Sequence, residues 1–448
     1  MIGYKFVRRI ASLLATFRRD RLGAILILSG LLMPLLIGFV GIGLDATLWY
    51  MLKRQIQTSV DAGVIAGAHT LAKGSNKGQA IKATKDDVRR NDFIDAGGST
   101  IIVHIPPKDG AYAGNADAVE AIVTLEQRLY FTALLGAGPV KIRARAVASK
   151  AVTGESCVIG LHETMKGAVE FSGAADATIK CGITSNSSAE EALHIFGNAY
   201  LDADPIYTVG DIYVQGSATF TYDEPPITYG YPAEDPYADL TVPTDPVDCN
   251  QGNTSFGEKT NIDDDPLTVL DPGRYCGGIK ITSSNVIFNA GLYIIDSGDL
   301  ETAGTPTLEG TGVTFVFTAT NGAGAPGNPN DIGGLKIVGG TTADLKAPIS
   351  GDWQGILFYQ DQNAPCCQGS VLIKNEILGG SETILQGAMY FPNQEVVYSG
   401  GSDTADSCFM LVANKVTFTG LSTISATVDN CNAAGITMAK QISVRLVE

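Results

Sequence analysis

The chain has 448 residues, enough for two or three domains, and a net charge of −16. Acidic residues outnumber basic ones by 47 to 31, so the chain lacks the excess positive charge that nucleic-acid binding requires, and we expect no nucleic-acid partner. The four histidines are dispersed and no Cys-x-x-Cys occurs, which argues against structural zinc; we expect no metal or other cofactor. Eight cysteines indicate an oxidising compartment.

Residues 23–44 form an uncharged, predominantly apolar run. About 20 apolar residues cross a hydrocarbon core of ~30 Å, so this run predicts a transmembrane helix. Residues 1–22 contain six basic side chains and one acidic one, which predicts a cytoplasmic basic arm and places the rest of the chain outside the cytoplasm. A cleaved signal peptide is the alternative. The run is longer than a typical signal sequence and no small-residue cleavage site follows it, so a retained span is favoured.

Residues 45–152 are predicted to form a juxtamembrane helix and a small α+β unit. The helix is expected to continue from the membrane span, because residues 45–71 are rich in helix-forming residues and lack proline. Ala62, Ala66 and Thr70 recur at helical spacing, which predicts close packing on another helix of this chain or of a partner. The remaining expected elements are a helical segment at 73–95, strands at 99–105, 118–125 and 140–149, and a short helix at 130–135.

Residues 153–448 repeat the pattern apolar-x-apolar-x-Gly. The pattern is centred on Gly173, Gly197, Gly216 and Gly420, and the first three glycines are 24 and 19 residues apart. A period near 20 residues with short strands is typical of a solenoid. The chain is therefore predicted to be mainly β, with a right-handed parallel β-helix-like solenoid as its ectodomain. Further short strands are expected at 279–282, 286–288, 292–295, 313–318, 335–338, 355–359, 371–374, 388–391 and 396–398.

Residues 223–272 interrupt the repeats with recurrent prolines. Proline is excluded from central strands, so this stretch predicts an extended insertion on the solenoid surface. Residues 321–331 predict a second, smaller loop.

The cysteine spacing offers a separate test of the solenoid. Stacked coils place equivalent residues about 4.8 Å apart, which is within the range that a disulfide spans. The bridges expected are Cys157–Cys181 and Cys408–Cys431, each one coil apart, and Cys249–Cys276 across a coil that carries a loop. The adjacent Cys366 and Cys367 form either a vicinal disulfide or two outward-facing thiols.

The first 70 residues resemble the N-terminal module of the TadG-like proteins of tight-adherence (Flp) pilus systems. The resemblance rests on the basic arm before Gly23-Ala24, the span with Pro34, Asp45 at its end, and the run DAGVIAGA that starts at Asp61. Later phrases such as VKIRARAVAS and GAMYFPNQEVVYSGG are similar to the middle unit and the β-helix-like ectodomains of one branch of that family.

This resemblance implies a structural and assembly component of a Flp-type pilus system. It would be a single-pass protein of the bacterial inner membrane, with its N-terminus cytoplasmic and its C-terminal domain periplasmic. Its expected partners are other pilus assembly proteins and inner-membrane lipid; whether it self-associates is open. Leu28 stands where pilins carry glutamate, so pilin-like processing is not expected, and the Asp-x-Ser-x-Ser metal motif of some relatives is absent. The candidates for partner contact are Asp45, Asp61, Ala62 and Ala66, although Asp61 at a solvent-facing position is the simpler interpretation.

The alternative function is binding or cleavage of envelope polysaccharide, because parallel β-helices also carry lyases and hydrolases. Asp202, Asp204 and Asp211 are the carboxylates that such chemistry could use, and the acidic run 263–265 could take calcium. Neither a nucleophile elbow nor a P-loop motif occurs, so we expect a structural protein rather than an enzyme. The aromatic residues that could line a glycan groove are Tyr207, Tyr213, Tyr222, Tyr229, Tyr231 and Tyr237.

Overall fold

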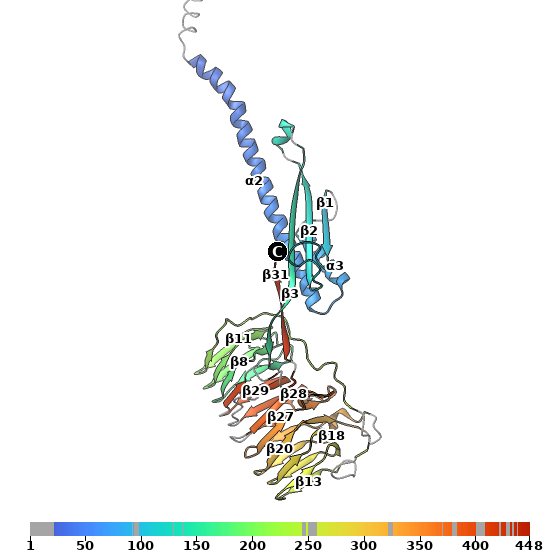
Figure 1. Cartoon of the computed structure of the whole chain (residues 1–448). Helices are drawn as coiled ribbons and strands as arrows, with labels where there is room; N and C mark the ends of the chain where they lie inside the picture. Colours follow the sequence, from blue (N-terminus) through green and yellow to red (C-terminus); the bar gives the residue numbers. More distant parts are fainter. Residues whose placement is uncertain are drawn as a thin grey trace, which may run out of the picture. The chain divides into compact units, whose positions relative to one another are not determined.

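The computed structural model describes most of the chain, and its described residues fall into two compact units (Figure 1). Unit 1 contains the residues up to Ala151 together with Val444–Glu448, and unit 2 contains Val152–Ser443. The predicted basic arm and the first half of the predicted loop at 321–331 lie outside the described part. The described residues are 22–91, 93, 98–128, 130–136, 138–243, 248–249, 258–320, 326–369, 371–378, 383–399, 408–420, 423–426, 431, 434–436 and 438–448.

Unit 1 is the small α+β unit expected from the sequence. Its first element, α2 (Leu22–Ala72), is a single helix that includes both the apolar run and the segment predicted to continue it. The second helix, α3 (Lys77–Arg90), begins with a capping box in which Asn76 and Gln79 satisfy each other's backbone N–H groups. The sheet has the order β1 (Ser99–His104), β2 (Ala118–Gln127), β3 (Val140–Ser156) and β31 (Ala439–Leu446), and the 3-10 helix η1 (Thr132–Leu135) lies between β2 and β3.

The C-terminal half of α2 packs on this sheet through a stripe of apolar side chains. Ile56, Val60, Val64 and Ala68 are fully buried, and residues four apart share one face of a helix. Their partners on the sheet include Val119, Val123 and Ala144. This stripe differs from the small-residue face that the sequence singled out, because Ala62, Ala66 and Thr70 are only half-buried.

Two glycines of α2 explain how α3 reaches it closely. A Cβ atom at Gly63 would lie 3.0 Å from the Thr84 carbonyl oxygen, and one at Gly67 would overlap with the Thr84 hydroxyl group and lie 3.1 Å from Val119. Only glycine leaves room for the α3 backbone at these positions. The helix partner predicted for this region is therefore supplied by the same chain.

An ionic cluster links β1, β2, β3 and the C-terminal residue within unit 1. The buried Glu120 carboxylate accepts a hydrogen bond from Arg145 Nε (2.6 Å), and His104 Nδ1 lies 2.7 Å from its other oxygen. Arg145 also pairs with Glu448. Burial raises the pKa of Glu120, but hydrogen bonds from Arg145 and His104 outweigh burial and leave the pKa below its usual value. Glu120 therefore stays ionised where Arg145 needs a counter-charge.

Unit 2 is a β-solenoid of about 11 turns, which confirms the predicted fold class. Its strands pair in parallel with equivalent strands of neighbouring coils, apart from the β25–β26 hairpin. The strands of its first part are β4 (Val158–Gly160), β5 (Val169–Phe171), β6 (Asp176–Ile179), β7 (Ile183–Ser185), β8 (Leu193–Gly197), β9 (Tyr200–Ala203), β10 (Ile206–Thr208), β11 (Ile212–Gly216) and β12 (Thr219–Thr221).

The second part of unit 2 returns to the first. Its elements are β13 (Thr260–Asp263), β14 (Thr268–Leu270), β15 (Gly273–Cys276), β16 (Ile279–Thr282), β17 (Asn285–Phe288), β18 (Gly291–Asp296), β19 (Leu300–Ala303), β20 (Thr307–Thr311), β21 (Val313–Thr318), η2 (Pro329–Asp331), β22 (Leu335–Ile337), β23 (Thr342–Lys346), β24 (Ile356–Gln360), β25 (Cys367–Gln368), β26 (Val371–Leu372), β27 (Lys374–Ile377), β28 (Thr383–Ser399), β29 (Phe409–Thr419) and β30 (Thr423–Ala426).

The spatial order of the coils differs from their order along the chain. Strand β29, near the end of the chain, pairs with β4 and β5, which begin the solenoid. In Figure 1 the green coils of β8 and β11 therefore follow the red coil of β29, and the yellow β13 lies at the opposite end of the stack. One inward-facing position can be followed through eight successive coils, as Tyr293, Phe315, Phe358, Met389, Leu411, Val158, Ile183 and Ile206.

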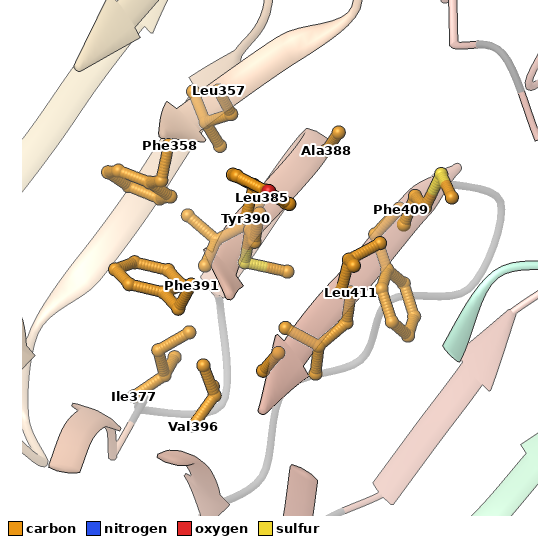
Figure 2. Packing of buried hydrophobic residues seen from close by; sticks show 14 of the residues in the cluster. Leu357, Phe358, Ile377, Leu385, Ala388, Tyr390, Phe391, Val396, Phe409 and Leu411 are labelled. Atoms are coloured by element: carbon orange, nitrogen blue, oxygen red, sulfur yellow. The ribbon is translucent and has the colours of Figure 1, made fainter. Parts of the chain in front are cut away.

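These inward side chains form the core of the solenoid. Figure 2 shows Phe358, Phe391, Ile377 and Val396 from neighbouring strands gathered in the interior. The rings of Phe315 and Phe358 stack with centroids 5.4 Å apart, a separation at which an aromatic pair adds about 1 kcal/mol to simple burial.

The glycines of the repeat form a ladder at one corner of the coils. Gly420, Gly173, Gly197 and Gly216 have φ between +69° and +78°, and each lies at the end of a strand that pairs with a neighbouring coil, or just after it. A Cβ atom at Gly197 would lie 3.0 Å from the Gly173 carbonyl oxygen, so both conformation and space require glycine there. The Gly420 repeat stacks on the Gly173 repeat although 247 residues separate them.

The proline-rich insertion returns the chain from one end of the stack to the other. We call residues 227–243 together with Cys249 the strap. The strap hydrogen-bonds successively to the coils of Thr208 (at Ile227), Asn186 (at Ala233), Tyr390 (at Asp235) and Tyr359 (at Leu240) and ends at the Cys249–Cys276 disulfide. The insertion is shorter than predicted, because residues 260–272 include β13 and β14.

The strap explains why the strands beneath it are buried on both faces. Tyr359 and Tyr390 point outward from adjacent coils, yet both are buried, and the ring of Tyr237 packs edge-on against Tyr390 at 5.4 Å. Both faces of β21 and β24 are buried along their whole length. Strands covered on both faces lose the alternation of apolar and polar residues.

All eight cysteines are paired: three pairs are those that the spacing indicated, and Cys366 with Cys367 forms the vicinal pair, one of the two alternatives left open for them. The Cα–Cα distances are 5.5 Å for Cys157–Cys181, 4.9 Å for Cys408–Cys431, 5.6 Å for Cys249–Cys276 and 3.7 Å for the vicinal pair Cys366–Cys367. The reason for the third bridge differs from the expectation, because it joins the strap to a coil and not one coil to the next.

Gly67→Leu is expected to destabilise unit 1 by about 1–3 kcal/mol, because the new side chain must displace Thr84 and Val119. Amide hydrogen exchange in the detergent-solubilised chain should show faster exchange throughout α3. Gly38→Leu is the matched control, since no atom lies within 4 Å of a Cβ at that glycine of the same helix. Equal exchange in the two variants would show that the close approach of α3 contributes no stability.

Replacing Cys249 and Cys276 together with serine is expected to free the end of the strap and to lower the stability of unit 2 by about 3 kcal/mol, because the bridge closes a loop of 27 residues. Limited proteolysis should then cut within residues 227–243 first. The Cys366→Ser, Cys367→Ser double variant is the control, because a bridge between adjacent residues constrains almost no chain. Equal protease resistance of both double variants would contradict the role given to the strap.

Candidate anchoring and partner-contact site

The N-terminal half of α2 exposes apolar side chains on all sides. From Leu28 to Leu44 its large hydrophobic residues are exposed, and this helix is long and apolar enough to cross a membrane once. At 1.5 Å per residue, the run 23–44 measures about 33 Å, which matches the hydrocarbon thickness. Trp49 and Tyr50 follow on the exposed surface, as in the aromatic belts of membrane interfaces, and the Arg54 guanidinium lies 5.8 Å from the centre of the Tyr50 ring.

Asp45 stands directly at the end of this run and is only 2% exposed. Its carboxylate accepts hydrogen bonds from the backbone N–H groups of Tyr130 (3.0 Å), Phe131 (2.9 Å) and Thr132 (2.6 Å). The Thr132 hydroxyl donates a further bond of 2.8 Å. Asp45 therefore holds the start of η1, within the β2–β3 connection, against α2. Its carboxylate oxygens accept these hydrogen bonds from its own chain.

The protonation of Asp45 follows from these contacts. Removal from water raises the pKa of a carboxyl group, but the bonds from Thr132, Tyr130 and Phe131 favour the ionised form more strongly, so the pKa of Asp45 lies below its usual value. The side chain is thus a fixed anion surrounded by amide donors. As a partner contact it is a poorer candidate than the sequence indicated.

Asp61, Ala62 and Ala66 lie on a different part of α2. Asp61 is half-buried and accepts a hydrogen bond from Gln57 Nε2 (2.8 Å), which also donates to the Arg145 carbonyl oxygen. Ala62 and Ala66 are half-buried as well. These three side chains are placed at the margin of the packed core, where partial exposure leaves them accessible.

Ala66 belongs to a groove between α2 and α3 with a volume of about 610 Å³. Its lining combines the small side chains of Ala66 and Ala83 with charged ones of α3, which form the ion pairs Lys82–Asp86 (2.9 Å) and Arg90–Asp87 (3.9 Å). A partner could therefore meet both small and charged side chains on this surface. The lining residues are Ala66, His69, Thr70, Gln79, Lys82, Ala83, Asp86, Asp87 and Arg90.

The carboxylates considered for catalysis have partners within unit 2. Asp202 pairs with Lys180 at 3.0 Å, and Lys180 also pairs with Asp223. Asp204 accepts a bond from the Glu224 backbone N–H, and Asp211 accepts one from the Tyr229 hydroxyl at 3.0 Å. Asp202 therefore links two adjacent coils through Lys180, whereas Asp204 ties a coil to the start of the insertion and Asp211 ties a coil to the strap.

The acidic run at 263–265 and the tyrosine series are likewise dispersed. Asp265 accepts bonds from the Leu267 N–H and the Thr268 hydroxyl and so closes a local turn. Within the described ranges no group of three or more His, Cys, Asp or Glu side chains is placed to hold a metal ion. Tyr207 is buried, and Tyr237 of the strap packs against Tyr390, whereas Tyr213, Tyr222 and Tyr229 are exposed and Tyr231 is half-buried. The series therefore does not line one groove.

Two features of the site escape sequence reasoning. One is the contact of Asp45 with η1, for which an isolated acidic residue at the end of an apolar run is the available signal. The other is the return of β31 to the sheet of unit 1; residues 153–448 were predicted to form one ectodomain, and this is corrected by the membership of Val444–Glu448 in unit 1. Strands that pair although they lie far apart in the chain leave no local signal.

In a comparison with known proteins, the anchoring region matches a protein-family model. The family described as "Putative Flp pilus-assembly TadE/G-like" matches residues 23–70, which are nearly all of α2. No curated protein and no solved structure matches the chain. The expected resemblance is thus confirmed for the N-terminal helix: the chain carries a TadE/G-like Flp pilus-assembly domain, followed by a β-solenoid.

Proposed function

We propose that the protein is a membrane-anchored structural component of a Flp-type pilus assembly system that acts through contacts with other pilus proteins. The observation that carries the proposal is the coincidence of the family match with the membrane-spanning helix, which also carries Ala66 in the groove between α2 and α3. The groove between α2 and α3 is the contact surface we assign to a partner. Its small side chains, Ala66 and Ala83, leave room for a helix of another assembly protein to pack closely.

The proposed orientation has the N-terminus in the cytoplasm and unit 2 in the periplasm, with the inner membrane as the site of anchoring. The six basic residues before the span support the cytoplasmic N-terminus. The four disulfides support an oxidising location for unit 2.

A structural role also fits the side-chain chemistry of the solenoid. The carboxylates that a glycosidase would use form ion pairs and hydrogen bonds that fasten coils to one another, as with Asp202 and Lys180, or to the insertion and the strap, as with Asp211 and Tyr229. A rigid, covalently bridged stack of coils is suited to hold a surface at a distance from the membrane. We therefore propose that the protein is not an enzyme.

The decisive experiment counts surface pili by electron microscopy in a deletion strain and in complemented strains. The full chain should restore pili, and a form exported by a cleavable signal but lacking residues 1–44 should not, because the matching helix would lose its span. Unchanged pili in the deletion strain would contradict the proposed role.

The Asp202→Asn, Asp211→Asn double variant is the matched control for this experiment. It removes two carboxylates of the alternative function while leaving α2 intact, and it is expected to restore pili fully. Failure of this variant to restore pili, when it accumulates at the normal level with intact disulfides, would favour a polysaccharide-directed activity in place of the structural role.

The orientation is tested with single added cysteines, because all eight native cysteines are paired. Ile349→Cys, at an exposed position of unit 2, should react with a membrane-impermeant maleimide in intact spheroplasts. Ala11→Cys, in the basic arm, should react only after the membrane is permeabilised. The reverse pattern would show the opposite orientation.

A further inference from the structure

Tyr130 and Phe131, in the β2–β3 connection just before η1, form an exposed aromatic tip. Tyr130 and Phe131 have 70% and 39% of their surfaces exposed. Phe131 also touches α2 at Gly41, where a Cβ atom would lie 2.8 Å from three carbon atoms of the Phe131 side chain. Because Gly41 has no side chain, this ring lies directly against the helix, which fixes the tip at a defined level of α2.

That level is inside the apolar run. Gly41 precedes Leu44, the last residue of the run, by three positions, or about 4.5 Å along the helix. Trp49 and Tyr50, the exposed aromatic pair, follow Leu44 by about 8 Å in the other direction. The tip therefore lies on the membrane side of the residues that mark the interface.

We propose that residues 130–133 form a second membrane contact, in which Tyr130 and Phe131 insert into the interfacial layer of the leaflet beside α2. Aromatic rings favour this layer, where the ring meets apolar chains and a phenol hydroxyl stays hydrated. No charged residue occurs between Tyr130 and Leu135. The contact rests on membrane anchoring by α2 and is independent of the pilus role, so the two proposals can fail separately.

Asp45 is the positioning residue of this contact. A carboxylate next to the hydrocarbon core is costly unless donors surround it. Here the amides of Tyr130, Phe131 and Thr132 supply those donors and at the same time tie the tip to the helix. With both a helix and a tip in the leaflet, the rotation of α2 about its axis is fixed relative to the membrane.

Ile102 of β1 provides a matched control position in the same unit, with 46% of its surface exposed. It pairs with Ile122, which pairs with Arg145, whose carbonyl oxygen accepts a bond from Gln57 of α2. Gln57 follows Leu44 by 13 positions, so Ile102 lies about 20 Å beyond the apolar run.

The test uses tryptophan fluorescence of the full chain reconstituted into phosphatidylcholine–phosphatidylglycerol vesicles that contain acyl-chain-brominated lipid. Both native tryptophans are replaced by phenylalanine, and Tyr130→Trp, Phe131→Trp or Ile102→Trp is added. A chain that keeps only Trp49 reports insertion of the span. We expect at least threefold stronger quenching for Tyr130→Trp than for Ile102→Trp, with blue-shifted emission.

Quenching of Tyr130→Trp no stronger than that of Ile102→Trp, in vesicles where Trp49 is quenched, would overturn the proposal. Phe131→Trp can disturb the contact with Gly41, so the exposed Tyr130 position is decisive. Adding Asp45→Ala to Tyr130→Trp should reduce the quenching at least twofold, because the tip is no longer tied to α2. Undiminished quenching in that variant would overturn the role assigned to Asp45.

Discussion

The solenoid depends on the strap, because its coils do not stack in the order in which they are synthesised. The first coil of the chain lies in the middle of the stack, between β29 on one side and β7 on the other. To start the second half, the chain must travel the length of the stack, and the strap does so along an outward face that would otherwise expose Tyr359 and Tyr390. Burial of that face, hydrogen bonds such as Asn186–Ala233 and the Cys249–Cys276 bridge make the return path part of the fold.

Unit 1 depends on one long helix that meets two environments. Its first half is apolar on every side, as a span must be, whereas its second half confines apolar side chains to a stripe that packs on the sheet. Asp45 lies at the boundary between the two halves. Its hydrogen bonds to the amides of Tyr130, Phe131 and Thr132 stabilise a charge beside the membrane and attach the β2–β3 connection to the helix. The glycines at 63 and 67 then let α3 cover the helix, so the small-residue pattern serves intramolecular packing while Ala66 remains at the edge of a groove.

For the candidate site, sequence reasoning identified the helix and its family but not the contacts that single residues make within the chain. Asp45, a candidate for partner contact, binds backbone amides of its own chain, and hydrogen bonding between residues 85 or more positions apart leaves no trace in a single sequence. The disulfide pairs were accessible because stacked coils convert sequence spacing into distance. For Cys249 the predicted partner, Cys276, was right, but the predicted reason was not: the bridge joins the strap to a coil. A surface strap and a coil with a loop produce a similar sequence spacing.

The sequence by itself determined the apolar span, the parallel solenoid and its glycine corners, because each is written in a local pattern: an uncharged run, a period near 20 residues, and glycines where φ is positive. It also located strands rich in β-branched and aromatic residues, such as β16 and β21, but missed polar ones such as β20 and β23, which are stabilised by pairing on both sides and not by their own propensity. Only the tertiary structure decided that the Gly420 repeat stacks on the Gly173 repeat, that β31 completes the first sheet, and that the strap covers the second. Each of these joins segments far apart in the chain, and such pairings are selected by the free energy of burying complementary surfaces, which no local pattern specifies.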